Sequence, residues 1–158
     1  MSKKILALVL AASAVAVAVA ASLHPLQVNT GLWQMTATTT WAGLPPQLDA
    51  QLGNGRTNHY TSCVRPRDLS TNPWAEGSRD GCKWTVLTST GTDMEVRGTS
   101  CDMGRDYGMT AVVHGRIHVL DPKDGTGSFD ITMSGNGQTV TGHASYTGKW
   151  VGASCPTE

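Results

Sequence analysis

Residues 31–41 read GLWQMTATTTW, and apolar and polar side chains alternate along this stretch. Trp33, Met35, Ala37, Thr39 and Trp41 fall on one face, whereas the other face carries a glutamine and threonines. A period of two residues is typical of a half-buried β-strand, because successive side chains of a strand point to opposite faces of the sheet. The stretch therefore predicts a strand with one face toward a core and one toward water.

The same alternation recurs further along the chain. It predicts strands within residues 82–86, 94–98, 107–119, 128–133 and 140–150. Turn-forming sequences separate them, at residues 89–92, 121–125 and 134–137. Among these, Asp124-Gly125 and Asn136-Gly137 are predicted to supply the positive φ angles of tight hairpin turns.

These strands predict an all-β fold. We expect an antiparallel meander of about seven to eight strands, curled into a small barrel or half-barrel, because curling removes or shortens exposed sheet edges. A two-sheet sandwich is the alternative. Residues 42–56 are expected to form a loop. In the region from residue 65 to 81, only a short helical turn near Arg67–Ser70 is expected.

The N-terminal residues have the pattern of an export signal. Lys3 and Lys4 precede a continuous apolar run over residues 5–21, and small residues follow it. A positive start, an apolar stretch and a small-x-small site are typical of a secretory signal peptide. We therefore divide the chain into a signal peptide, residues 1–22, and one β-rich domain, residues 23–158. Periplasmic export is the prediction, and an uncleaved N-terminal membrane anchor is the alternative.

The charge distribution argues against nucleic acid as a partner. Without Lys3 and Lys4, ten Lys and Arg residues stand against twelve Asp and Glu residues. The basic residues are scattered, whereas a surface that follows a phosphate backbone needs them clustered. After the first 22 residues, no segment is long and apolar enough to span a membrane.

Four cysteines follow the export signal: Cys63, Cys82, Cys101 and Cys155. An even number in an exported chain predicts disulfides. Cys82 and Cys101 flank a predicted hairpin, so we pair them, which leaves Cys63 to pair with Cys155. The long gaps between the cysteines argue against a zinc site, which usually shows closely paired cysteines.

Pairing Cys82 with Cys101 requires an irregularity in the hairpin. Cys82 shares a face with Trp84, whereas strict alternation puts Cys101 on the face opposite to Met94 and Gly98. Directly opposed residues of a hairpin point the same way. The bridge therefore predicts a β-bulge near Gly98 or pairing at the strand ends.

No motif for catalysis, a cofactor or a metal is recognisable in the sequence. His114 and His118 share a strand face but are expected to lie about 13 Å apart, too far to share one metal ion. His143 is predicted on a nearby strand. We interpret these histidines as part of a polar outer face, expect no cofactor, and do not expect an enzyme; a hydrolase with a scattered site is the less favoured alternative.

The apolar face offers a candidate binding site. Its large side chains converge inside a curled sheet, where they either pack as a core or line a cup for an apolar ligand. The candidate ligand-binding residues are Trp33, Trp41, Trp84, Tyr146 and Trp150.

Short motifs along the chain resemble a known family. They are Asn29-Thr-Gly-Leu-Trp-Gln-Met35, a Leu44-Pro-Pro46 loop before Cys63, the Cys82–Cys101 hairpin, and Tyr146-Thr-Gly-Lys-Trp-Val-Gly152 before Cys155. Together they resemble the exported bacterial family called domain of unknown function 3617. Gln34 stands where Glu is usual in the family, and two residues separate Gly152 from Cys155. The resemblance implies a periplasmic, disulfide-bonded β-domain and no activity.

These observations lead to one functional hypothesis and its rivals. We expect an uncharacterised, non-enzymatic binding or accessory module of the cell envelope, with an apolar ligand or an envelope protein as its partner. A structural or interaction protein that uses its threonine-rich outer face or a strand edge is the alternative.

Overall fold

The computed structural model describes residues 23–46, 49, 53–69, 81–101 and 108–156. The predicted signal peptide, residues 1–22, and Tyr107 lie outside these ranges. The described residues contain seven strands and one short 3₁₀-helix, η1. In chain order they are β1 (Gly31–Ala42), β2 (Thr57–Val64), η1 (Pro66–Leu69), β3 (Lys83–Ser89), β4 (Asp93–Cys101), β5 (Thr110–Asp121), β6 (Asp124–Gly135) and β7 (Gln138–Gly152). Pro46 and Asp49, in the region expected to form a loop, also have helical conformation.

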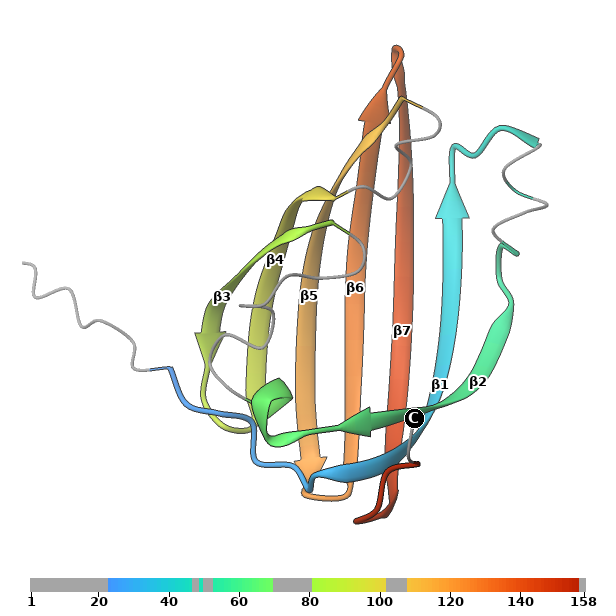
Figure 1. The fold of residues 1–158 in the computed structure, drawn as a ribbon. Coiled ribbons are helices and arrows are strands. Elements are labelled where there is room, and N and C mark those ends of the chain that lie inside the picture. Colours follow the sequence, from blue (N-terminus) through green and yellow to red (C-terminus); the bar gives the residue numbers. More distant parts are fainter. Residues whose placement is uncertain (1–22, 47–48, 50–52, 70–80, 102–107, 157–158) are drawn as a thin grey trace, which may run out of the picture.

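All seven strands form one antiparallel sheet in the order β2-β1-β7-β6-β5-β4-β3. The all-β prediction is therefore confirmed, and the sheet is an open half-barrel, because β2 and β3 at its two edges are not paired with each other. In Figure 1, β1 and β2 curl across the lower ends of β5–β7, and η1 follows β2 toward β4. No helix among the residues described is long and apolar enough to cross a membrane.

The predicted alternation holds along the long strands. On β1, Trp33 and Ala37 are buried, and on β5 every second residue from Ala111 to Gly115 is buried. On β7, Val140 and Ala144 are buried between exposed neighbours. The sheet thus has a concave apolar inner face and a convex polar outer face.

One of the two predicted glycine turns is confirmed and one is wrong. Asn136 and Gly137 adopt positive φ angles, 51° and 74°, and join β6 to β7. The turn between β5 and β6 instead consists of Pro122 and Lys123, because Asp121 pairs directly with Asp124. Gly125 therefore lies within β6, where extended backbone needs no positive φ.

The second strand of the hairpin, β4, carries the predicted irregularity near Gly98, and both cysteines lie where the pairing of β3 with β4 ends. The register of β4 against β5 shifts between Gly98 and Cys101, and Ser100 in the shifted segment has a φ of 55°. The extra residue turns Cys101 to the inner face, where it is 1% exposed and bonded to Cys82. The second disulfide joins Cys63 to Cys155, so the two pairs are those that the sequence predicted.

Packed side chains fill the end of the half-barrel near the β6–β7 turn, which is the upper end in Figure 1. Its buried cluster surrounds the Cys82–Cys101 disulfide and includes Met109, Ala111, Val113, Ile131, Met133 and Val140. Trp41, Leu44, Trp84 and Phe129 pack against this cluster. We call this region the filled end.

Candidate functional site

The lower part of the half-barrel holds a cavity of about 600 Å³. We call this region the hollow end. The lining comes from the N-terminal segment, from β1, β2, η1 and β3, and from β5, β6 and β7. Its volume lies within the range of about 300–1,000 Å³ that is usual for small-molecule sites. Because the residues that line it are far apart in the sequence, only the curled sheet brings them together.

The N-terminal segment closes the lower end of the cavity. The backbone N–H groups of His24, Gln27 and Asn29 donate to the carbonyl oxygens of Ser89, Gly91 and Pro122, at 2.7–2.9 Å. These acceptors lie in the tips of the β3–β4 and β5–β6 hairpins, so the segment runs across both tips. Leu26 and Val28 thereby project into the hollow end, where Leu26 is buried.

Two glycines make the floor of the cavity. Gly125 and Gly127 lie on the inner face of β6 and both line it. A Cβ atom added at either position meets a backbone oxygen at 3.3 Å and no side chain closer than 3.8 Å. The backbone of β6 is therefore open to whatever occupies the cavity.

Other inner-face glycines are covered by a large side chain of the residue paired with them. These pairs are Gly98 with Trp84, Gly115 with Phe129, Gly142 with Trp41, and Gly148 with Met35. The covering atoms lie 2.4–3.1 Å from the position of an added Cβ, so these glycines are spaces that the side chains already use. Gly125 and Gly127 have no such cover.

Most of the polar side chains of the cavity come from β2 and η1, and Tyr146 of β7 adds a phenol. Tyr60 and Ser62 belong to β2, and Asp68 belongs to η1 directly after it. Burial raises the pKa of the Tyr146 phenol. Burial, and after it the electrostatic interaction with Tyr146, raises the pKa of Tyr60, so the two phenols lie near each other and favour their neutral forms.

Asp68 is the acidic side chain in this lining, and its charge is already compensated. Its Oδ2 accepts a hydrogen bond from the Arg65 backbone N–H at 2.7 Å. Its Oδ1 lies 3.8 Å from Nε of Arg67, whose side chain is the more exposed of the two. No Lys or Arg is among the described residues that line the cavity.

The sequence-predicted binding residues divide into two groups. Trp33, Trp84 and Tyr146 line the cavity, and Trp33 is 4% exposed. Trp41 packs against the filled end. Trp150 lies at the lower rim outside the cavity lining, where Lys123 Nζ sits 5.2 Å from its ring centroid.

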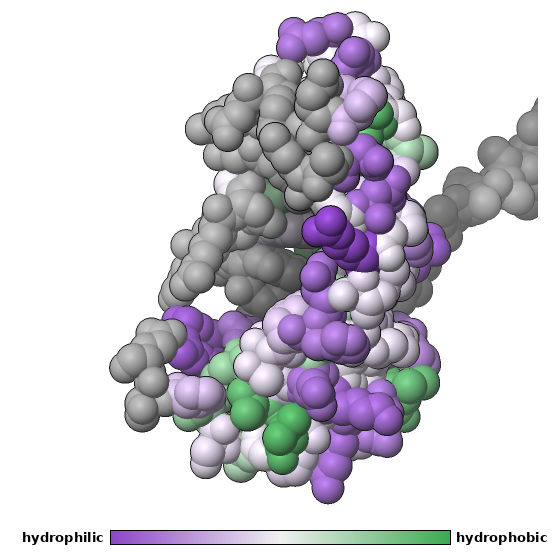
Figure 2. All heavy atoms as spheres, turned by 90° about the vertical axis from the view of Figure 1, so that its right-hand side faces the viewer, coloured by the Kyte–Doolittle hydropathy of each residue, from purple (hydrophilic) through white to green (hydrophobic). Residues whose placement is uncertain are grey.

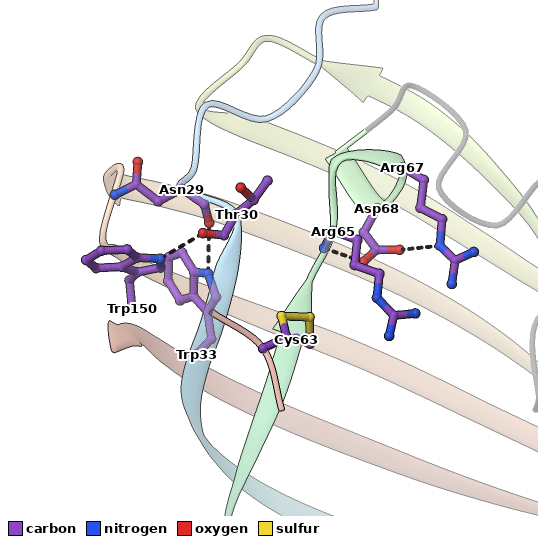
Figure 3. Close-up of a disulfide and its surroundings, with 9 residues drawn as sticks. Asn29, Thr30, Trp33, Cys63, Arg65, Arg67, Asp68 and Trp150 are labelled. Atoms are coloured by element: carbon purple, nitrogen blue, oxygen red, sulfur yellow. Dashed lines mark hydrogen bonds and ion pairs between the residues drawn. A yellow bond between two sulfur atoms is a disulfide. The ribbon is translucent and has the colours of Figure 1, made fainter. Parts of the chain in front are cut away.

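Figure 3 shows how the rim is held together. The indole N–H of Trp33 donates to the carbonyl oxygen of Asn29, and that of Trp150 donates to Thr30, both at 2.9 Å. The Cys63–Cys155 disulfide lies beside them and ties the end of β2 to the segment after β7. The tryptophans thus fix the start of β1, and their polar atoms are used within the chain.

Sequence reasoning missed the residues of β2 and the two floor glycines. Tyr60 and Ser62 stand in a strand of mostly exposed residues without a clear apolar period. The sequence Asp124-Gly125 favours a turn, which conceals the place of Gly125 in β6. The alternation of Gly125, Gly127 and Phe129 is the one signal in the sequence that places these glycines on the inner face.

The histidines of the outer face pair with separate carboxylates. Nδ1 of His118 lies 2.6 Å from Asp93, and Nδ1 of His143 lies 2.7 Å from Asp130. Nε2 of His114 lies 3.0 Å from Glu95, which also contacts Arg116. Within the ranges described, no three His, Cys, Asp or Glu side chains are grouped to hold a metal ion.

The outer surface of β1 and β2 shows little hydrophobic area. In Figure 2 this side is mostly hydrophilic or neutral, with small separate hydrophobic spots. Among the described residues, the large apolar side chains that are exposed are scattered through the chain: Leu23, Tyr60, Leu87, Val112, Leu120 and Val151. Single exposed apolar residues of this kind are normal on a protein surface.

Comparison with protein-family models identifies the family. The model described as "Protein of unknown function (DUF3617)" matches residues 28–155, which span all seven strands and both disulfides. The chain belongs to the DUF3617 family. The resemblance seen in the sequence motifs is thereby confirmed. No similar protein was found among the curated proteins, and none among the solved structures.

Proposed function

We propose that this DUF3617 protein is a non-catalytic binding module that holds one apolar ligand in its hollow end. The observation that supports this most is the contrast within one sheet. The inner face is closely filled around the Cys82–Cys101 disulfide, whereas the same face leaves about 600 Å³ open at the other end. A mostly apolar cavity with a few polar groups on one side is the usual character of a small-molecule site.

The place of action proposed for this module is the periplasm. Disulfides form and persist in oxidising compartments, and this chain has two. The apolar run of residues 5–21 supplies the export signal in this proposal. An apolar molecule in such a compartment needs shielding from water, and a half-barrel of this size gives that shielding to one small ligand.

Binding of a neutral apolar probe tests the proposal. The fluorescence of N-phenyl-1-naphthylamine is recorded during titration with the purified, oxidised protein. We expect saturable binding that the substitution Gly127→Leu weakens about tenfold or more, because a leucine there occupies the cavity above β6. Equal binding to both proteins would overturn the proposal.

A matched variant controls for nonspecific effects. Thr132 lies on the same strand, is exposed, and faces outward. The substitution Thr132→Leu adds an apolar side chain to β6 without reaching the cavity, so we expect the binding constant to stay within about twofold of the original value.

Native mass spectrometry of gently purified protein then reports whether a ligand remains bound to the protein.

A further inference from the structure

The floor of the hollow end breaks a pattern that the rest of the inner face follows. Gly98, Gly115, Gly142 and Gly148 each lie beneath a ring or a methionine from the neighbouring strand. Gly125 and Gly127 lie on the same face without such a cover, between Ile117, Phe129 and Tyr146. An apolar group of a ligand that lay along β6 would fill this space as the rings fill the others.

The polar side-chain groups of the cavity gather toward β2 and η1. They are the hydroxyl groups of Tyr60 and Ser62 and the carboxylate of Asp68, and the phenol of Tyr146 on β7, which is paired with Gly127, interacts electrostatically with Tyr60. Tyr60 is 44% exposed, so this side is also where the cavity meets water. A ligand that satisfies both regions has an apolar part on the glycines and a polar end beside β2.

The charges beside β2 already form a pair. Asp68 contacts Arg67 and caps the Arg65 backbone N–H, and no other carboxylate and no Lys or Arg is among the described lining residues. His118 contributes to the lining, but its imidazole is directed to Asp93 on the outer face. A charged ligand head would give up part of its hydration here and would find no opposite charge outside the Asp68–Arg67 pair.

We infer that the ligand of the hollow end is an uncharged amphiphile, with its apolar part on Gly125 and Gly127 and a hydrogen-bonding polar end at Tyr60, Ser62 and Asp68. This inference rests on the proposed function and names the ligand class of the same cavity. Hydroxyl groups donate and accept hydrogen bonds, so an alcohol or amide end finds partners there.

Three probes with one alkyl chain and different heads test the inference. Dodecanol, dodecanoate and dodecyltrimethylammonium compete with N-phenyl-1-naphthylamine at pH 8. The two ions are kept below the concentrations at which they form micelles, and dodecanol is kept below its solubility limit. We expect dodecanol to displace the fluorophore at a concentration at least about fivefold lower than either ion. If either ion binds as tightly as the alcohol, the inference is overturned.

Two opposite charge changes locate the polar end. Asp68→Asn keeps an oxygen that accepts from the Arg65 N–H but removes the negative charge beside Arg67. The affinity for dodecanoate should therefore rise relative to that for dodecanol. Arg67→Gln should favour dodecyltrimethylammonium instead. Asp130→Asn, which removes the same charge from the outer face, should leave the order of the affinities for the three probes unchanged. If neither change at residues 67 and 68 alters the order, the polar end does not lie at Asp68 and the placement is wrong.

The outcomes separate the inference from the function on which it rests. If no member of the series displaces the fluorophore, and Gly127→Leu binds it as the unsubstituted protein does, the cavity is not a binding site and both ideas fail. If the series binds and Gly127→Leu abolishes that binding, but an ion is preferred, only the ligand class is wrong.

Discussion

The two ends of the half-barrel are built from the same strands and differ in what their inner faces carry. At the filled end, β6 and β7 place Ile131, Met133 and Val140 inward. At the hollow end, β6 places Gly125 and Gly127 inward. Alternation decides which face of a strand is buried, but the size of the inward residue decides whether the interior is filled. A sheet can therefore be equally regular along its length and still be filled at one end, while at the other end it leaves a cavity beside a smaller packed cluster of Leu26, Met94, Val96 and Val119.

The largest expected effect comes from the disulfide at the hollow end. It joins Cys63 to Cys155 across 92 residues, whereas the bridge at the filled end spans 19. Replacing both Cys63 and Cys155 by Ala should lower the free energy of unfolding by about 4–5 kcal/mol, and replacing Cys82 and Cys101 should cost about 3 kcal/mol in chain entropy. Urea denaturation of the two double variants measures the difference. A loss below about 2 kcal/mol at the hollow end would show that other contacts hold this region together.

The next prediction compares the loss of stability when one methionine at each end is replaced by alanine. Met133 is 5% exposed within the filled cluster, whereas Met35 lines the cavity. Met133→Ala should cost about 2–5 kcal/mol, because it creates a space in a packed core. Met35→Ala should cost about 1 kcal/mol or less, because its side chain already borders an open space. Thermal and urea denaturation measure both. Equal losses would indicate that the hollow end is packed in solution.

A smaller difference in stability is expected between alanine substitutions at a covered and at an uncovered glycine. A Cβ added at Gly142 lies 2.4 Å from the Trp41 ring, so Gly142→Ala should cost about 1–3 kcal/mol through displacement of that ring. Gly127→Ala should change stability by less than about 1 kcal/mol, because the new methyl enters the cavity and alanine restricts the unfolded chain. If Gly127→Ala destabilises as strongly as Gly142→Ala, the space above β6 is already filled.

Much of the fold could be predicted from the sequence because alternation is a local property. The inner and outer faces of β1, β5 and β7 follow directly from it. The bulge between Gly98 and Cys101 was also predictable, since the disulfide and the strand period conflict without it.

The cavity could not be predicted in the same way. Its position depends on how far β1 and β2 curl and on which inward residues meet across the sheet, which are nonlocal properties. Gly125 follows Asp124, so its local sequence favours a turn. The tighter turn at Pro122 and Lys123 overrides that preference and brings Gly125 into β6. Trp150 was expected to face a ligand, but its N–H is used by Thr30 at the rim.

The smallest expected effect is a pH dependence confined to the hollow end. Burial raises the pKa values of Tyr146 and Tyr60 above the ordinary value of 10.0. The neutral phenols are therefore favoured in the folded protein, and their contribution to stability is fully present below pH 10 and is lost as the pH rises through the raised pKa values. Absorbance at 295 nm during an alkaline titration follows each tyrosine, with Tyr60→Phe and Tyr146→Phe to assign the transitions. A bound amphiphile should move the Tyr146 transition to still higher pH because it removes water from the phenol. The described buried residues of the filled end include no tyrosine, so the Tyr146 transition reports on the hollow end. If a saturating ligand does not shift that transition, the ligand binds outside the hollow end.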